Sequence, residues 1–215
     1  PFKSPQNFNR LNLFGKYSAF LKGSDRITFT ASHFTSSWDA SGQIPEREVQ
    51  NGNITRFGAI DDTEGGFTSR TNLNVQFNKT LSDDSLLKTN VFYSKYNFEL
   101  YSNFTFFLDD VVNGDQIKQF ENRDIFGLNA QIINNKKFGN VEAKFTKGVG
   151  LRYDLIDDNE LSHTKNRSEV VDRIQLGDVR QTNMYAFLNS EFEIGKLKIS
   201  PSIRVDFIQG LYNDA

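Results

Sequence analysis

The feature that most constrains this chain is the alternation of apolar and polar residues over long segments. Segment 71–78 reads TNLNVQFN, in which each apolar residue is followed by Asn or Gln. Because successive side chains of a β-strand point to opposite faces, this pattern predicts a strand with one apolar and one polar face, as in an antiparallel sheet. About eight segments show it: 11–22, 26–34, 71–78, 86–96, 125–133, 141–153, 183–194 and 197–207.

The connections between these segments alternate in length. Four are short, at 23–25, 81–85, 134–140 and 195–196, and three are long, at roughly 35–70, 97–124 and 154–182. In an up-and-down antiparallel sheet, every second connection lies at the same end. We therefore expect all short turns at one end of the sheet and all long loops at the other.

The predicted strands are long for a soluble protein. About 11–13 residues rising ~3.3 Å each and tilted by ~40° span about 28 Å, close to the ~25 Å apolar band of an outer-membrane barrel, whereas strands average ~5–6 residues in globular proteins. The mean hydropathy of −0.53 is compatible, because only one face of each strand must meet lipid. The expected fold is all-β: an antiparallel up-and-down transmembrane β-barrel segment with short periplasmic turns, long extracellular loops and interfacial Tyr17, Tyr93 and Tyr153. A soluble sandwich or solenoid is the alternative.

Composition excludes several classes of function. Lys and Arg number 25 against 27 Asp and Glu, so no basic excess indicates nucleic acid as a partner. The chain has no cysteine, which excludes disulfides, thiolate metal sites and a Cys nucleophile. The two histidines, His33 and His163, are far apart, and no G-x-S-x-G segment accompanies them. We expect no enzymatic activity, no cofactor and no metal site.

Three shorter motifs have competing interpretations. DDVVNGDQ at 109–116 departs from the calcium-loop pattern, so a turn or cap is the simpler reading. The acidic segment DLIDDNELSH at 154–163 is interpreted as a solvated loop, with a bound cation as the alternative. GVG at 148–150 has no helix after it, so we expect its glycines to relieve crowding or twist a strand rather than to bind phosphate.

Three stretches from the long connections and strand ends carry a family resemblance. They are SWDASGQIPEREV, RFGAIDDTEGGFTSRTNLN and SNFTFFLDDVVNGDQIKQFENRDIFG, in that order. They resemble the extracellular loops and strand ends of TonB-dependent outer-membrane receptors, particularly those of Bacteroidetes-type bacteria, and the resemblance extends over essentially the whole chain. It implies a barrel of about 22 strands closed by a plug domain.

The resemblance also implies function and partners. Such receptors sit in the outer membrane of Gram-negative bacteria and take up a scarce small-molecule ligand, among which a ferric siderophore is favoured as the commonest cargo. Residues 1–215 contain no plug sequence, no coupling box and no aromatic C-terminal residue. We therefore expect one part of a single barrel domain. The implied partners are outer-membrane lipid, the plug domain of the same full-length chain, and the TonB energy-coupling complex, reached through the missing N-terminal region.

Two sets of residues are candidates for functional contacts. For ligand binding, or for a network that holds the first long loop, they are Trp38, Arg47, Arg56, Asp61, Asp62, Glu64 and Arg70. For a wet lumen wall that holds the plug by hydrogen bonds and ion pairs, they are Asn72, Asn74, Gln76, Asn129, Lys144, Arg152, Glu191 and Arg204. Trp38 also suits a lipid–water interface. Lys147 departs from the pattern by lying on an apolar face, and we expect it near the membrane rim.

Two other functions stay open. A self-contained eight-stranded structural or adhesive outer-membrane barrel requires its first and last strands to pair with each other. A secreted β-rich glycan-binding or hydrolytic protein requires a carboxylate pair on a concave face. If instead the segment belongs to a wider barrel, its two bare edges predict that it does not fold alone.

Overall fold

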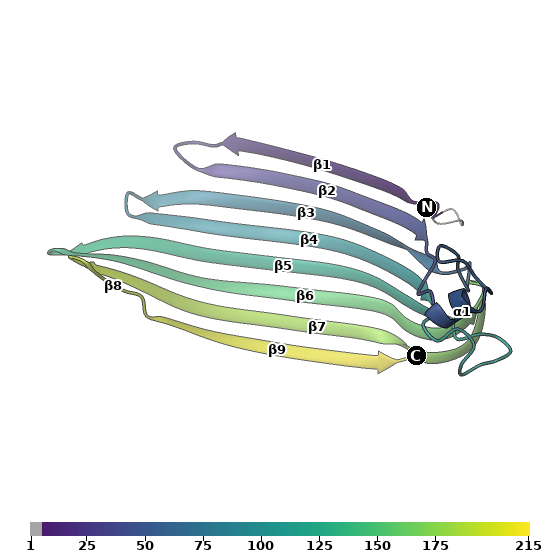
Figure 1. The fold of residues 1–215 in the computed structure, drawn as a ribbon. Helices are drawn as coiled ribbons and strands as arrows, with labels where there is room; N and C mark the ends of the chain where they lie inside the picture. The colour runs from purple at the N-terminus through teal and green to yellow at the C-terminus, as the bar shows by residue number, and fades with distance from the viewer. Residues whose placement is uncertain (1–5) are drawn as a thin grey trace.

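The computed structural model describes residues 6–215 and contains one antiparallel sheet (Figure 1). The elements are β1 (Asn9–Phe20), β2 (Arg26–Asp39), α1 (Glu46–Gln50), β3 (Gly65–Ser82), β4 (Ser85–Ser102), β5 (Ile117–Phe138), β6 (Val141–Lys165), β7 (Glu169–Ile194), β8 (Leu197–Ile199) and β9 (Ser202–Asp214). Each strand from β1 to β7 pairs with the next in sequence, and both β8 and β9 pair with β7. The predicted up-and-down antiparallel fold is confirmed.

The connections 21–25, 83–84, 139–140 and 195–196 lie at one end of the sheet, and loops 40–64 and 103–116 lie at the other, together with the short β6–β7 turn at 166–168 (Figure 1). The turns after β5 and β7 begin with Gly139 and Gly195, whose φ angles are +60° and +59°. Tight hairpin turns favour glycine in this left-handed conformation, because it has no Cβ to clash. The predicted asymmetry between the two ends is confirmed for the four short connections and for two of the three long ones.

The strands extend further into the loop end than the alternation predicts. β6 has 25 residues and β7 has 26, so the third long loop predicted at 154–182 is wrong. The chain instead turns back within 166–168, and the other two loops shorten to 40–64 and 103–116. Cross-strand ion pairs such as Arg180–Asp157, at 2.7 Å, replace apolar contacts there. The strands therefore continue after their apolar alternation has ended.

The last predicted strand is interrupted at Pro201. The Ser190 N–H donates to the Pro201 carbonyl at 2.9 Å, but proline has no N–H with which to return the second bond of the pair. The ladder resumes where Ser202 faces Asn189. Residues 197–207 therefore form two strands, β8 and the first part of β9, along one line.

The register places the predicted apolar and polar faces on opposite sides of the sheet. One row across the apolar face contains Phe29, Val75, Val91, Leu128, Leu151, Met184 and Phe207. Val91, Leu128 and Leu151 are 50%, 38% and 40% exposed, although they lie near the middle of the sheet. No second layer covers this face among residues 6–215. Such an exposed apolar face is what a barrel wall presents to lipid.

The apolar face ends in a row of aromatic side chains on its loop side. Tyr93 and Tyr153 flank Phe126 in this row, and the Tyr93 hydroxyl donates to Asp124 Oδ1 at 2.5 Å. Lys95 and Asp124 face each other in the following row. Tyrosine at such a border keeps its ring in the apolar layer and its hydroxyl outside it, as in an interfacial girdle.

Both edges of the sheet are open. In the described chain, β1 pairs only with β2, and β9 only with β7. The pairing of first and last strands that a closed eight-stranded barrel requires is therefore absent from residues 6–215. Each edge leaves a row of backbone N–H and C=O groups for a further strand. No described helix is long and apolar enough to cross a membrane.

Candidate functional site

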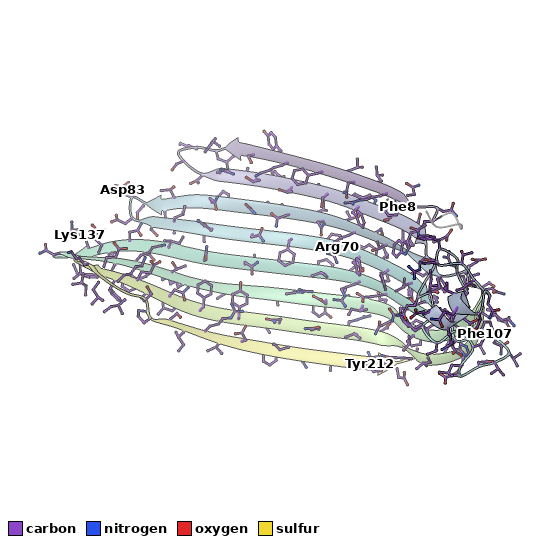
Figure 2. All side chains as sticks on the ribbon, viewed as in Figure 1. Phe8, Arg70, Asp83, Phe107, Lys137 and Tyr212 are labelled. Carbon is purple, nitrogen blue, oxygen red and sulfur yellow. The ribbon has the colours of Figure 1, made fainter. Side chains whose placement is uncertain are left out.

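Most of the buried polar side chains lie at the loop end of the sheet, which Phe107 marks in Figure 2. Loops 40–64 and 103–116 meet the tip of the β6–β7 hairpin there. We call the following nine residues the outer cluster: Asp39, Asp61, Thr63, Glu64, Tyr101, Asn103, Gln116, Thr164 and Arg167. They come from five separate stretches of the chain.

Gln116 joins the two loops to the hairpin. Its Nε2 donates to Asp61 Oδ2 at 3.0 Å and to Thr63 Oγ1 at 2.6 Å. Its Oε1 accepts from Thr164 Oγ1 at 3.1 Å and from the Arg167 N–H at 3.0 Å. The Gln116 side chain is almost fully buried, so each of these bonds would be costly to lose.

Asp61 is the main acceptor of the cluster. Besides Gln116, it accepts bonds from Asn103 Nδ2 at 2.9 Å and from the Thr63 N–H at 2.9 Å. Burial by itself would raise the pKa of Asp61, but the hydrogen bonds from Thr63, Asn103 and Gln116 outweigh it and lower the pKa. The carboxylate therefore keeps its charge and its acceptors into mildly acidic solution.

Arg167 connects the hairpin tip to loop 40–64. Its guanidinium donates to the backbone carbonyls of Thr63 and Glu64, and it pairs with Asp39 at 2.9 Å between Nη2 and Oδ1. It also lies 5.8 Å from the centre of the Tyr101 ring. One side chain thus holds the end of β2, the end of loop 40–64 and the end of β4 together.

The backbone at Arg167 is unfavourable for its residue type. Asn166 and Arg167 have φ angles of +53° and +59°, and hairpin turns of this kind prefer Asn followed by Gly. Asn166 fits this preference, but an arginine in the left-handed region is strained. The contacts of the Arg167 side chain offset that strain.

Glu64 is buried without a full set of partners. The residue is 4% exposed, and its Oε2 accepts the Asn103 N–H at 3.1 Å. Its Oε1 has no hydrogen-bond partner among the described residues. Gly42 packs against this oxygen so closely that a Cβ at position 42 would overlap it. Burial, with a smaller contribution from the Asp61 charge, raises the pKa of Glu64.

The polar face of the sheet is the second candidate region. The register places all eight predicted lumen residues on it: Asn72, Asn74, Gln76, Asn129, Lys144, Arg152, Glu191 and Arg204. Several of these side chains make hydrogen bonds to side chains on the neighbouring strand. Ser94 Oγ donates to Asn72 Oδ1 at 2.8 Å, and Asn74 Nδ2 donates to Asn90 Oδ1 at 2.6 Å. The face is therefore a cross-linked polar surface.

Carboxylates on the polar face are held by cations. Arg152 makes two bonds of 2.7 Å to Asp154, and Lys144 pairs with Glu191 at 3.2 Å. Glu191 also pairs with Lys198 at 2.5 Å. A glycosidase needs two carboxyl groups facing one bond, one of them able to donate a proton. Charge-paired carboxylates spread along the sheet do not provide that arrangement.

Solved structures with the same architecture have names that describe them as importers of iron compounds. The whole chain superposes on 31% of the ferric citrate transporter FecA in its unliganded form, with a TM-score of 0.79 and 12% identity. It also superposes on the ferric-catecholate import receptor Fiu of E. coli K12. In the closed form the TM-score is 0.71 at 12% identity, over 99% of this chain and 36% of that one. In the open form it is 0.68 at 10% identity, over 98% and 39%.

The chain has the fold of the barrel wall in these two import proteins. It spans about a third of the length of these structures, at 31–39% of each. No family model and no curated protein matches the sequence. The resemblance inferred from the sequence is confirmed at the level of the fold.

The barrel wall brings two of the predicted loop residues, Asp61 and Glu64, into one cluster. The cation beside them is Arg167, which the sequence pattern did not single out. Arg47 lies in α1 and, among the described residues, pairs only with its neighbour Glu48, at 3.4 Å, with 75% of its side chain exposed. Arg56 is exposed, and Asp62 lies in the same loop.

The remaining two predicted loop residues lie on strands of the wall. Trp38 is the penultimate residue of β2, and its ring packs 3.0 Å from the position that a Cβ at Gly66 would occupy. Arg70 lies on the polar face of β3, where its guanidinium stacks 4.5 Å from the centre of the Tyr96 ring. Neither joins the outer cluster.

Sequence reasoning missed the residues that link the loops. Asn103, Gln116 and Thr164 are uncharged and follow no periodic pattern, and their partners are distant in sequence. The sequence does contain one feature that points to Arg167. The dipeptide Asn166–Arg167 stands where a tight hairpin prefers Asn–Gly, and an arginine at such a position suggests that its side chain has a role.

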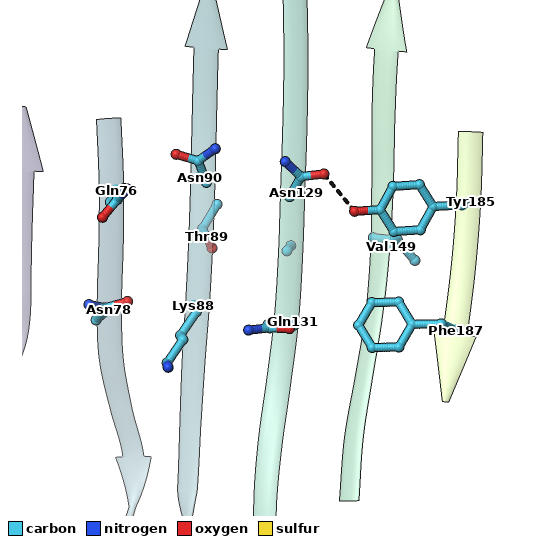
Figure 3. A pocket seen from close by; sticks show the side chains of 11 residues that line it. Gln76, Asn78, Lys88, Thr89, Asn90, Asn129, Gln131, Val149, Tyr185 and Phe187 are labelled. Atoms are coloured by element: carbon cyan, nitrogen blue, oxygen red, sulfur yellow. Dashed lines mark hydrogen bonds between the residues drawn. The ribbon is translucent and has the colours of Figure 1, made fainter. Parts of the chain in front are cut away.

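Aromatic rings of the polar face lie across glycines on the neighbouring strand. A Cβ at Gly150 would overlap the Tyr185 ring, and one at Gly148 would come within 2.5 Å of the Phe187 ring. The Tyr185 hydroxyl passes across β6 and donates to Asn129 Oδ1 on β5 at 2.7 Å (Figure 3). The expectation that the GVG glycines relieve crowding is confirmed.

These rings border a shallow hollow of about 260 Å³ in the polar face. Figure 3 shows its amide and lysine side chains on three successive strands, of which the strand with Asn129 and Gln131 is nearest the two rings. They are Gln76, Asn78, Lys88, Asn90, Asn129 and Gln131. The hollow thus offers hydrogen-bond donors and acceptors next to an aromatic surface.

The acidic loop segment 109–116 is a turn stabilised by its own carboxylates. Asp110 Oδ1 accepts the N–H groups of Val112 and Asn113 at 2.9 and 2.8 Å. The bonds from Asn113, then that from Val112, lower the pKa of Asp110 to about 2. Asp115 accepts the Leu108 N–H at 2.8 Å. The turn interpretation is confirmed.

The other acidic segment, 154–163, is not a loop. It lies within β6, so its carboxylates are distributed over both faces and paired separately. Glu160 pairs with Lys118 at 2.7 Å, and Asp154 with Arg152. Within residues 6–215, no group of three or more His, Asp or Glu side chains is arranged to hold a metal ion.

Proposed function

We propose that this chain is part of the barrel wall of a TonB-dependent receptor in the outer membrane of a Gram-negative bacterium. The observation that carries the proposal is the two-sided sheet. Its apolar face is exposed across the middle of seven strands, and its polar face is cross-linked by amides and ion pairs. The first face needs lipid and the second needs water or protein, a combination typical of a plugged barrel.

The proposal assigns partners to each part of the sheet. Lipid covers the apolar face, and further strands of the same barrel pair with the open edges of β1 and β9. The plug domain, supplied by the rest of the polypeptide, contacts the polar face around residues such as Asn129 and Arg152. The TonB complex acts through the N-terminal region of that polypeptide. The wall itself performs no covalent chemistry.

The proposed cargo is a ferric siderophore. The solved structures with this fold are named for ferric citrate and ferric catecholate, and ferric siderophores are the commonest cargo of the family that the sequence resembles. In this proposal the outer cluster shapes part of the mouth of the barrel and fixes the loops that a ligand passes. Candidate contact residues are those exposed on the loops, such as Arg47 and Arg56.

Uptake by whole cells tests this function. The gene is deleted from its host, and cells grown under iron limitation are given radiolabelled iron bound to citrate, catecholates or hydroxamates, with labelled haem and cobalamin in parallel. We expect the deletion to abolish uptake of one iron complex, and a protonophore to abolish it in wild-type cells. Restoration by the native gene is the control.

Two results would overturn the proposal. One is uptake of every compound at the wild-type rate in the deletion strain. The other is recovery of the native protein in the soluble fraction without detergent. Loss of haem or cobalamin uptake alone would keep the receptor function and replace the siderophore as its cargo.

A further inference from the structure

Lys147 is a cation in the middle of apolar surroundings. It lies on the apolar face of β6, between Phe145 and Val149 along the strand. Ile132 and Leu188 face it from the two neighbouring strands. Three outward positions of β6 separate it from the turn at 139–140, so it lies inside the apolar face rather than at its rim. The Lys147 side chain is exposed.

Other cations on this face have carboxylates beside them. These pairs all lie toward the loop end: Lys95 with Asp124 at 3.2 Å, Lys118 with Glu160 at 2.7 Å, and Arg180 with Asp157 at 2.7 Å. Their charge is compensated within the sheet. They need no outside anion.

Lys147 has no such compensation. The eight nearest positions on its face hold Phe145, Val149, Ile132, Leu188, Ala130, Asn134, Ala186 and Ser190. None of these residues is acidic. Two more lysines on the face, Lys79 and Lys136, lie nearer the short turns, where Asp25 and Asp83 stand in the adjacent turns. Among residues 6–215, Lys147 is thus the cation of the apolar face that has no acidic residue at a neighbouring position or in an adjacent turn.

The chemistry of the surroundings limits what its counterion is. A charged ammonium in hydrocarbon is unfavourable, but the four-carbon stem of lysine can lie along apolar side chains and carry the charge to the polar head-group layer. The anion present throughout that layer is lipid phosphate. We propose that Lys147 binds the phosphate of a phospholipid head group in the leaflet next to the short turns. This inference rests on the membrane location under Proposed function.

Unfolding in vesicles of two compositions tests the proposal. The native full-length protein is inserted into phosphatidylcholine vesicles, and into vesicles in which about one third of the lipid is anionic phosphatidylglycerol. Urea unfolding is followed by tryptophan fluorescence. We expect the anionic lipid to raise the folding equilibrium constant about fivefold through this site. Lys147→Met should lose this roughly fivefold increase. In pure phosphatidylcholine it should be more stable than the native protein.

Lys88→Met is the matched control. Lys88 lies two strands away from Lys147, in the adjacent row on the opposite, polar face. It should keep the full effect of phosphatidylglycerol. Inorganic phosphate added to phosphatidylcholine vesicles should not reproduce the effect, because free phosphate does not partition to the lipid face.

The outcomes separate the two proposals. If the native protein inserts but Lys147→Met keeps the same phosphatidylglycerol dependence, Lys147 is not a lipid-phosphate site, and the receptor proposal is untouched. If inorganic phosphate alone reproduces the effect, the site binds free phosphate and the lipid assignment is wrong. If the native protein does not enter vesicles at all, both the membrane location and this inference fail.

Discussion

The barrel wall and the outer cluster are stabilised by opposite kinds of contact. In the wall, the strands from β1 to β7 pair with the next strand in sequence, β8 and β9 both pair with β7, and large apolar side chains stay exposed. In the outer cluster, polar side chains are buried, and their partners lie far along the chain. Gln116 bonds to Asp61, 55 residues away, and Arg167 to Thr63, 104 residues away. The stability of the wall therefore depends on which face of the sheet a residue occupies. The stability of the outer cluster depends on individual polar atoms.

The largest expected effect tests how strongly stability depends on the face of the wall that a residue occupies. Leu128→Arg places a charge in the centre of the apolar face and should destabilise the membrane-inserted protein by about 2–4 kcal/mol. Gln131→Arg, three residues along β5 and on the polar face, should change stability by less than about 1 kcal/mol. Urea unfolding in lipid vesicles measures both. Equal losses would contradict the assignment of the faces.

This dependence on face explains why the wall could be predicted from the sequence. Alternation with a period of two fixes which side chains share a face, and tight turns with Gly fix the register. The prediction failed beyond Tyr153 on β6 because alternation of apolar residues marks only the part of a strand that meets lipid. Past that point the strand continues and is stabilised by ion pairs such as Arg180–Asp157. Such pairs produce no alternation of apolar and polar residues in the sequence.

The second prediction concerns Arg167. Arg167→Gly relieves the left-handed backbone strain, so the turn itself should be improved, but the charged hydrogen bonds to loop 40–64 are lost. We expect local opening at the Ala40 N–H, which bonds to the Glu64 carbonyl at 2.9 Å, to become easier by about 1.5–3 kcal/mol. Hydrogen exchange of that amide measures it.

Arg47→Gly is the control for Arg167. Arg47 belongs to the same loop but is mostly exposed, and its partner within the described part of the chain is Glu48. Surface pairs of this kind contribute little. Protection at Ala40 should stay as in the native protein. If Arg167→Gly also leaves that protection unchanged, Arg167 does not hold the loop, and the outer cluster has another centre.

The outer cluster could not be predicted because nothing local encodes it. Asp61 and Glu64 were candidates for their charge alone, and the charge does not reveal that amides 42 and 55 residues away would bond to Asp61. The fold of the wall has to form first, since it brings the ends of β3, β4 and β6 together. Only then do the polar groups of the loops meet.

The third prediction returns to the wall. Gly150→Ala puts a Cβ into the Tyr185 ring and should displace its hydroxyl from Asn129, at a cost of about 1–2 kcal/mol, in the lower part of the range for overpacked sites. Gly210→Ala is the control, because a Cβ at Gly210 would meet no atom within 4 Å. It should be neutral or slightly stabilising. Unfolding in vesicles gives both values, and an equally neutral Gly150→Ala would show that the ring does not need the glycine.

The smallest expected effect is a pH dependence confined to the outer cluster. The folded protein raises the pKa of Glu64 above its usual 4.5, so protonated Glu64 stabilises the cluster below that value, and this stabilisation is lost as the pH rises through the folded pKa. Asp61 acts oppositely: its lowered pKa stabilises the cluster above 3.8, and that stabilisation is lost as the pH falls through its folded pKa.

The two carboxyl groups together predict an optimum. Protection of the Ala40 amide, corrected for intrinsic exchange, should be greater near pH 4.5 than at pH 7 and should fall again below pH 3.8. Glu64→Gln cannot ionise, so the difference between neutral and mildly acidic solution should vanish while the fall at low pH remains. Amides in the middle of the wall should show neither change. A pH response of the same sign and size in the wall would mean that the whole sheet titrates, and the contrast between the two regions would not hold.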